Sequence, residues 1–132
     1  MCVEKPPRKS LQTKEHSVTI YKEERPWGYF EVLIDAPGFK VKKITVNPGC
    51  RLSLQSHEKR NEHWIIVEGS MRITIGDHIE DYPENEHIYI SHGTKHRMKN
   101  LGNVPASVIE IQTGSYFGED DITRFEDDYD RV

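Results

Sequence analysis

The chain has 132 residues, of which 35% are hydrophobic, and its 18 basic and 22 acidic side chains give a formal net charge of -4. This length suits one domain with one core, and the negative charge argues against nucleic acid or an anionic membrane surface as a partner. No apolar run is long enough to span a membrane and the N-terminus lacks the apolar core of a signal peptide, so we expect a cytoplasmic protein. Its two cysteines, Cys2 and Cys50, do not indicate a disulfide framework.

Residues 1–20 are polar, carry Pro6 and Pro7 and show no clear period, which indicates a flexible arm that ends in a strand near residues 17–21. Residues 21–132 are expected to form one all-β domain. Short segments between turn residues predict strands at 28–34, 39–46, 63–68, 71–75, 87–91, 96–99 and 106–112. Many short strands favour a sandwich or a barrel. Residues 114–132 are acidic, and we expect a short helix or an ordered tail across the barrel.

Four side chains in two short blocks predict a metal site: Gln55, His57, Glu62 and His96. Gln55 and His57 are two residues apart, so on a strand both point to the same face. Glu62 follows after a turn and returns on a paired strand, and His96 arrives from a distant strand. Two imidazoles, a carboxylate and an amide suit zinc, manganese, iron, cobalt or nickel. We therefore predict one divalent metal ion per subunit, with coordination positions open to water or substrate.

The neighbours of Glu62 have predictable directions on the same strand. His63 faces the opposite side of the sheet, where a packing or interface role is expected. Trp64 shares the face of Glu62, and we expect it to pack beside the metal. Trp27 is expected to anchor a core or an interface.

Segments 49–69 and 85–100 resemble the two paired motifs of the cupin superfamily, with Gln55 at the place of the first His of the first motif. A closer resemblance is to the type II phosphomannose isomerase branch, in which this Gln is typical. It rests on RPWGYF, SLQSHEKRNEHWIIVEG and IEIQTGSYFGEDDITRFEDDYDR, and it spans about residues 24–131. The resemblance implies a single cupin double-stranded β-helix, or jelly-roll barrel.

The same resemblance implies a metal-dependent aldose–ketose isomerase, an intramolecular oxidoreductase that interconverts mannose 6-phosphate and fructose 6-phosphate through an enediolate. Glu110 is then a candidate for proton transfer and Arg124 a candidate for catalysis and for phosphate binding. Arg131, Lys95 and Arg97 are further candidates for phosphate binding, because basic side chains match phosphate oxygens.

Two other classes of function remain open. One is a non-catalytic cupin that binds a sugar or sugar phosphate and partners a separate nucleotidyltransferase. Many chains of this branch carry an upstream domain that makes GDP-mannose, but no Gly-rich nucleotide loop appears here, so guanylyltransferase activity is not expected. The other class is a different cupin enzyme, such as an epimerase or a dioxygenase, although Gln55 counts against a dioxygenase. We also expect a homodimer formed through exposed strands of one sheet.

Overall fold

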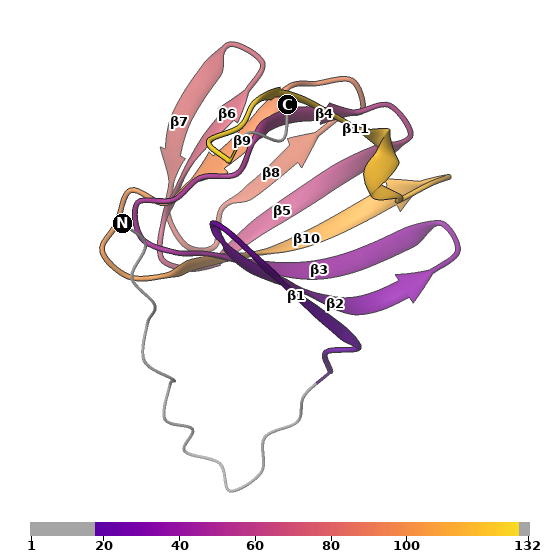
Figure 1. Cartoon of the computed structure of the whole chain (residues 1–132), viewed down its shortest axis with the longest axis horizontal. Helices are drawn as coiled ribbons and strands as arrows, with labels where there is room; N and C mark the ends of the chain where they lie inside the picture. The colour runs from indigo at the N-terminus through magenta and orange to yellow at the C-terminus, as the bar shows by residue number, and fades with distance from the viewer. Residues whose placement is uncertain (1–17, 130–132) are drawn as a thin grey trace, which may run out of the picture.

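The computed structural model describes residues 18–129, which form two facing antiparallel β-sheets (Figure 1). The larger sheet has six strands in the order β1-β2-β3-β10-β5-β8. These are β1 (Tyr21–Arg25), β2 (Gly28–Ala36), β3 (Phe39–Val46), β10 (Ala106–Gly114), β5 (Arg60–Glu68) and β8 (His87–Ile90). The smaller sheet has the order β11-β4-β9-β6-β7. Its strands are β11 (Ile122–Glu126), β4 (Leu54–His57), β9 (His96–Lys99), β6 (Met71–Ile75) and β7 (His78–Tyr82), and the short 3-10 helix η1 (Glu119–Asp121) precedes β11. The predicted all-β architecture of two antiparallel sheets is confirmed.

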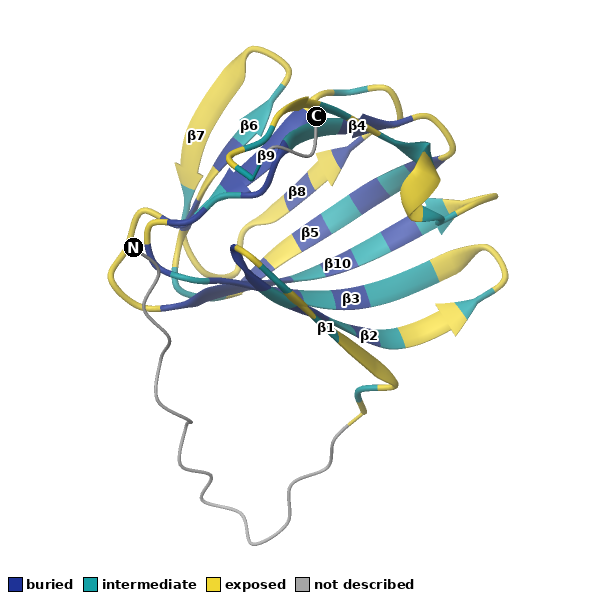
Figure 2. Cartoon of the chain, in the orientation of Figure 1, coloured by how far each residue is buried: buried dark blue, intermediate teal, exposed yellow. Residues whose placement is uncertain are grey.

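The core lies between the two sheets, because alternate residues of each strand point inward. On β5 the buried residues are Arg60, Glu62, Trp64 and Ile66, while the residues between them are more exposed. Figure 2 shows this alternation along β5 and β10. The apolar core also takes buried side chains from both sheets: Phe30, Val32, Ile44, Val46, Met71, Ile73, Ile88, Ile90, Met98 and Val108.

The interior of the larger sheet changes from apolar to polar along the strands. On β10, Val108 pairs with Ile44 of β3 and Ile66 of β5, and all three are apolar. Two residues further on, Glu110 pairs with Lys42 and Trp64. This polar end of the barrel therefore carries buried charges, which need partners inside the protein.

Gly28 in the RPWGYF segment is required by close packing of β2 on β3. Its φ is +149°, and a Cβ built there would lie 2.0 Å from the carbonyl oxygen of Thr45. Only glycine leaves room for this approach. The turn between β1 and β2 therefore depends on Gly28, and it places Trp27 in the core at 5% exposure, as expected.

Most of the predicted strands are confirmed to within three residues, and four regions differ. Strand β4 was not among the predicted strands. The predicted strand at 17–21 starts at Tyr21 and continues to Arg25. Strand β7 was not predicted, because four of its five residues are exposed and show no alternation. The acidic tail forms both η1 and the strand β11, which pairs with β4. The proposed arm at residues 1–17, including Cys2, lies outside the described residues. Within residues 18–129 no helix has the length and apolar character that a membrane span requires.

Candidate metal centre and binding pocket

Three of the four predicted metal ligands come together inside the barrel from both sheets. His57 ends β4, Glu62 lies on β5 and His96 begins β9, and all three are buried. One ligand atom from each lies within 4.8 Å of the others. Glu62 is central, because its Oε2 is 3.4 Å from His57 Nδ1 and its Oε1 is 3.7 Å from His96 Nε2. Such a His/Glu triad can bind a metal ion.

The hydrogen bonds of His96 fit the requirements of a metal ligand. Its Nδ1 lies 2.8 Å from the carbonyl oxygen of Thr94, which can only accept, so Nδ1 carries the proton. Nε2 is then left with its lone pair directed into the triad. This buried Nε2 has no hydrogen-bond partner among the described residues. The lone pair of His96 Nε2 faces the Glu62 carboxylate, and a cation bound between the two would stabilise both groups. The nitrogen and oxygen donors of the triad therefore fit a divalent metal ion.

Arg60 occupies the His57 side of the triad. Its Nε donates to Glu62 Oε2 at 2.9 Å, and its Nη2 lies 2.8 Å from His57 Nε2. Because a guanidinium only donates, His57 Nε2 accepts and the imidazole is neutral. Burial, and then the charge of Arg60, lower the pKa of His57 to about 3. A metal bound through His57 Nε2 therefore requires Arg60 to move away.

Gln55, the fourth predicted ligand, lies at the edge of this cluster. It pairs with His96 across β4 and β9, and it lines the same pocket. Its Oε1 accepts a hydrogen bond from the hydroxyl of Ser53 at 3.0 Å. The amide oxygen is thus near the triad but engaged with Ser53.

Further buried groups surround the Glu62 carboxylate. Trp64 Nε1 donates to Glu62 Oε1 at 2.9 Å, which agrees with the expected position of Trp64 beside the metal site. Burial alone raises the pKa of Glu62, but the charge of Arg60 and the hydrogen bond from Trp64 favour the ionised carboxylate and hold its pKa below its usual value. Burial, and then the negative charge of Glu62, raise the pKa of Glu110 to about 7. Glu110 Oε1 also accepts a hydrogen bond from Gln112 Nε2 at 2.6 Å. Of the two neighbouring buried carboxyl groups, Glu110 is therefore the weaker acid.

A pocket opens beside the triad, and His96 lies in its lining. Its wall carries apolar side chains, among them Trp27, Phe30, Ile44, Leu52 and Met98. Five basic side chains also line it, each from a different strand: Arg25, Lys42, Arg60, Arg97 and Arg124. Two acidic residues, Glu110 and Glu119, complete the charged lining. Three of the five basic side chains pair with carboxylates: Arg25 with Glu23 and Glu119, Arg60 with Glu62, and Arg97 with Glu126.

The predicted phosphate-binding residues differ in where they lie. Arg124 on β11 pairs with Gln55 and lines the pocket. Arg97 also lines it, although its Nε donates to the carbonyl oxygen of Leu52 and its Nη1 donates to Glu126. Lys95 is exposed, is not among the lining residues, and places its Nζ 4.2 Å from the centroid of the Phe125 ring. Arg131 lies outside the described residues.

Sequence reasoning missed Arg60 and Lys42, both of which are buried in the pocket. A signal was present for Arg60, because it precedes Glu62 by two residues and so shares its face on β5. Lys42 carries the same signal on β3, where it precedes the inward-facing Ile44 by two residues. Neither residue was considered for the site, because lysine and arginine are rarely buried.

Comparisons with known proteins place this arrangement in a family. The family described as "Mannose-6-phosphate isomerase C-terminal" matches residues 10–127. The chain is 51% identical over 108 residues to the Xanthan biosynthesis protein XanB of Xanthomonas campestris, a match that covers 82% of the chain and 23% of XanB. It is 46% identical over 108 residues to the Mannose-1-phosphate guanylyltransferase ManC of Salmonella typhimurium, covering 82% of the chain and 22% of ManC. The chain therefore spans less than a quarter of the length of these relatives.

A solved structure supports the fold. The chain resembles an uncharacterized protein of Klebsiella pneumoniae with a double-stranded β-helix domain, with a TM-score of 0.65 and 15% identity over 73% of this chain and 82% of that one. At this identity the likeness concerns the fold alone. The predicted cupin double-stranded β-helix is confirmed.

These relatives correct the expectation of a stand-alone isomerase. The sequence resemblance implied that this domain by itself interconverts mannose 6-phosphate and fructose 6-phosphate. That prediction is wrong, because the chain corresponds to a minor part of longer proteins, one of them named as a guanylyltransferase. The findings favour the alternative, a cupin domain that acts with a nucleotidyltransferase. The match over residues 10–127 shows that the chain belongs to the family of mannose-6-phosphate isomerase C-terminal domains.

Proposed function

We propose that the pocket binds a sugar phosphate and that the chain recognises this ligand for a nucleotidyltransferase. The proposal rests on one observation: five basic side chains line one pocket in a chain whose formal net charge is -4. Local positive charge in a cleft raises the concentration of an anionic ligand there. An apolar wall beside the charged groups is typical of sites for small organic ligands.

Lys42 and Arg124 are the proposed phosphate-binding residues. Lys42 is 6% exposed, and its Nζ lies 4.4 Å from the centroid of the Phe30 ring. A buried ammonium has lost most of its hydration, so a phosphate dianion gains more from it than from an exposed lysine. Arg124 lines the pocket from β11, and its planar guanidinium matches two phosphate oxygens.

The sugar ring is proposed to lie against the apolar wall. Trp27 and Phe30 present aromatic surface to the pocket, and Ser53 and Gln55 supply polar groups for hydroxyls. A few polar groups on an apolar wall fix the orientation of a bound ligand. This arrangement supports a phosphorylated sugar rather than inorganic phosphate as the ligand.

We also propose one divalent metal ion per subunit, held by His57, Glu62 and His96, with Gln55 as the fourth ligand. The unpartnered Nε2 of His96 beside the Glu62 carboxylate supports this assignment. When bound, such an ion supplies a Lewis acid that can fix an oxygen of the sugar. Movement of Arg60 away from His57 would release the second imidazole and also free a guanidinium for the ligand.

The proposed partner is a nucleotidyltransferase acting on mannose phosphate. This follows from ManC, which is named as a mannose-1-phosphate guanylyltransferase and contains a segment 46% identical to this chain. A domain that binds a mannose phosphate would raise the concentration of that sugar beside the transferase site. The sugar phosphate is thus the proposed link between the two domains.

Calorimetric titration of the purified chain with mannose 1-phosphate, mannose 6-phosphate and mannose tests the proposal. The phosphorylated sugars should bind at least about tenfold more tightly than mannose, since a charge-assisted contact contributes about 1.5–3 kcal/mol. Equal affinity for mannose and for both phosphates would overturn it. The same preparation is also assayed for formation of fructose 6-phosphate, because steady turnover by the chain alone would contradict a role limited to recognition.

A further inference from the structure

An acidic side chain lies among the cations of the pocket. Glu119 of η1 lines the pocket, and its Oε1 lies 3.4 Å from Nη2 of Arg25, a residue of β1. Both side chains are partly exposed, Glu119 at 49% and Arg25 at 26%. A carboxylate in this position repels an incoming phosphate and competes with it for Arg25. An anionic ligand can therefore use Arg25 only if Glu119 moves away.

Glu119 belongs to a short surface segment with few packing contacts. Residues 115–121, which we call the strap, connect β10 to β11 at one end of the barrel (Figure 1). None of the three residues of η1, which lies in the strap, is buried, and Figure 2 shows η1 at the surface. Segments with few buried contacts open at a low cost in free energy. The strap can therefore move without disturbing the core of the barrel.

Both ends of the strap are attached to the turn between β4 and β5. The Asp121 carboxylate accepts the backbone N–H groups of Lys59 at 3.0 Å and of Glu58 at 3.3 Å. At the other end, the N–H of Ser115 donates to the carbonyl oxygen of Lys59 at 3.3 Å. The residues between these two points form a loop from which Glu119 reaches the pocket.

The middle of the strap is held by two long contacts to arginines of the pocket. Arg60 Nη1 lies 3.4 Å from the carbonyl oxygen of Phe117, and Arg25 Nη2 lies 3.4 Å from Glu119 Oε1. Hydrogen bonds of this length are weaker than those near about 2.9 Å. The Glu119 side chain can therefore leave Arg25 while the ends of the strap stay attached.

Arg25 is the pocket arginine whose acidic partner a ligand replaces most easily. Arg60 pairs with Glu62, and both side chains are almost fully buried. Arg97 is 8% exposed, and its acidic partner is absent from the pocket lining. Glu119, in contrast, is half exposed and lines the pocket itself. Because an exposed ion pair contributes little free energy, a phosphate that carries about two charges displaces Glu119 from Arg25.

Arg25 also lies beside a residue already proposed for phosphate binding. Its guanidinium carbon is 5.5 Å from the centroid of the Phe30 ring, and Lys42 Nζ is 4.4 Å from the same centroid. Glu23, which does not line the pocket, forms a second ion pair with Arg25 and keeps the guanidinium in place when Glu119 leaves. Arg25 and Lys42 are therefore two cations of the pocket around one aromatic ring.

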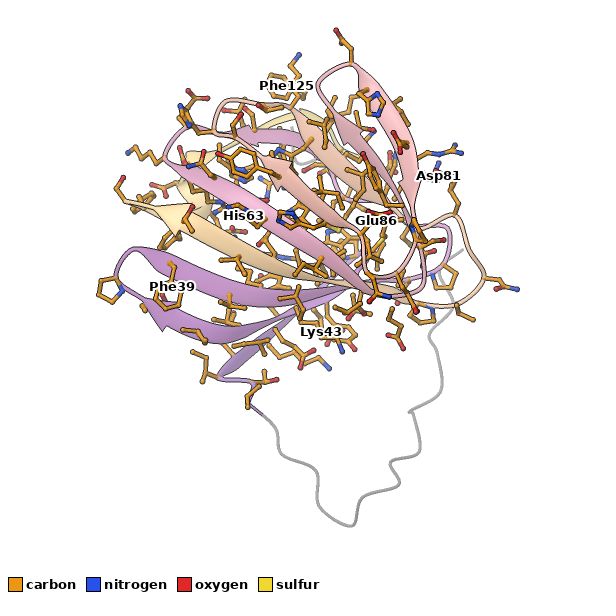
Figure 3. The ribbon with its side chains drawn as sticks, turned by 180° about the vertical axis from the view of Figure 1, so that it is seen from behind. Phe39, Lys43, His63, Asp81, Glu86 and Phe125 are labelled. Atoms are coloured by element: carbon orange, nitrogen blue, oxygen red, sulfur yellow. The ribbon has the colours of Figure 1, made fainter. Side chains whose placement is uncertain are left out.

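Movement of the strap also affects the strand that follows it. Strand β11 begins at Ile122, directly after the strap. Its Phe125 lies on the outside of the barrel at 40% exposure (Figure 3), and the neighbouring Arg124 lines the pocket. The strap and the proposed phosphate-binding Arg124 therefore belong to one continuous segment.

We propose that Arg25 is a third phosphate-binding residue, and that Glu119 is an internal anion that occupies it until a phosphorylated ligand arrives. The phosphate then takes the place of the carboxylate on Arg25, and the strap moves. A neutral sugar has no charge to replace the carboxylate and leaves the Arg25–Glu119 pair intact. Glu119 thus limits the affinity of the pocket for phosphorylated ligands. This role rests on the proposed function, because it requires a sugar phosphate as the ligand.

The test is calorimetric titration of the full chain and its variants with mannose 6-phosphate and with mannose. Glu119→Gln keeps the size of the side chain and removes its charge, so it should bind mannose 6-phosphate about tenfold more tightly than wild type and mannose equally well. Asp120→Asn is the matched control, because it makes the same change in net charge on the next residue of η1, which does not line the pocket. It should change both affinities by less than about twofold.

A double-mutant cycle tests the exchange on Arg25 itself. Arg25→Met should weaken binding of mannose 6-phosphate about tenfold, and adding Glu119→Gln to it should restore little, since the two changes act on one ion pair. Hydrogen exchange of the strap supplies a readout besides affinity. Mannose 6-phosphate should speed exchange of the backbone amides in residues 116–120 of wild type, and mannose should leave it unchanged.

The outcomes separate this role from the proposed function. If wild type prefers mannose 6-phosphate to mannose but Glu119→Gln binds it no more tightly, the role of Glu119 is overturned and the sugar-phosphate pocket stands. Equal gains in Glu119→Gln and Asp120→Asn would also overturn it, because net charge alone would then explain the effect. Equal affinity of wild type for mannose and mannose 6-phosphate would overturn the proposed function and this role together.

Discussion

Arg60 Nε lies 2.9 Å from Glu62 Oε2 inside the barrel, so the central carboxylate of the candidate metal centre is already paired with a cation. Both side chains are almost fully buried, at 3% and 2% exposure. A guanidinium and a divalent ion cannot both occupy this small space without strong repulsion. Metal binding and the position of Arg60 are therefore coupled.

Replacing Arg60 by methionine should expose this coupling. Without metal, Arg60→Met leaves the Glu62 charge buried and should lower the free energy of unfolding by about 3 kcal/mol. Bound metal restores the missing positive charge, so zinc or manganese should raise the melting temperature more in Arg60→Met than in wild type. Thermal unfolding with chelator and with metal measures both effects. An equal metal-induced shift in the two proteins would show that Arg60 and the metal do not compete.

The metal content of the protein should depend on the two buried histidines. Elemental analysis of protein purified without chelator should find about one equivalent of divalent metal, and His57→Ala and His96→Ala should each lose most of it. His78→Ala is the control, because His78 is exposed and pairs with Glu80 on β7. Full metal content in both His57→Ala and His96→Ala would place the ion elsewhere.

Phosphate recognition should depend on cations inside the pocket. Lys42→Met and Arg124→Met should each weaken binding of mannose 6-phosphate about 10- to 100-fold and leave weak binding of mannose unchanged, since each removes a charge-assisted contact. Lys95→Met is the matched control, because Lys95 is exposed outside the pocket lining. If Lys95→Met weakens binding as much as Lys42→Met does, the anion lies at the barrel surface instead.

The fold should tolerate alanine poorly at Gly28. A Cβ there would lie 2.0 Å from the Thr45 carbonyl oxygen, so Gly28→Ala forces β2 away from β3 and should cost about 1–3 kcal/mol. Gly38→Ala is the comparison, because its φ is +85° but nothing lies within 4 Å of the added Cβ. Urea denaturation of the two variants should show the larger loss at Gly28; the reverse order would contradict the packing argument.

The sequence pattern was sufficient to predict most strands of the larger sheet, because these strands alternate between buried and exposed residues. β5 and β10 show this clearly, whereas β4 and β9, which carry His57 and His96, do not alternate. The metal ligands were instead predicted from their residue types, their spacing and the family resemblance. β7 escaped prediction because its edge position leaves it exposed on both faces. Lys42 pairs across the sheet with Glu110 of β10, which is distant in sequence, so no local pattern reports its partner. Arg60 contacts His57 and Glu62, three and two residues away, and was missed although its partners are close in sequence.

The two tryptophans of the chain, Trp27 and Trp64, both line the pocket, so their indole signals report directly on its occupation. Trp64 Nε1 also donates to Glu62 of the candidate metal centre. Titration of ¹⁵N-labelled protein with mannose 6-phosphate, followed by the two indole N–H resonances, tests the central claim of a sugar-phosphate pocket. We expect both resonances to shift and saturate with mannose 6-phosphate, and to shift far less at equal concentrations of mannose. Two unmoved resonances at millimolar mannose 6-phosphate would contradict the claim.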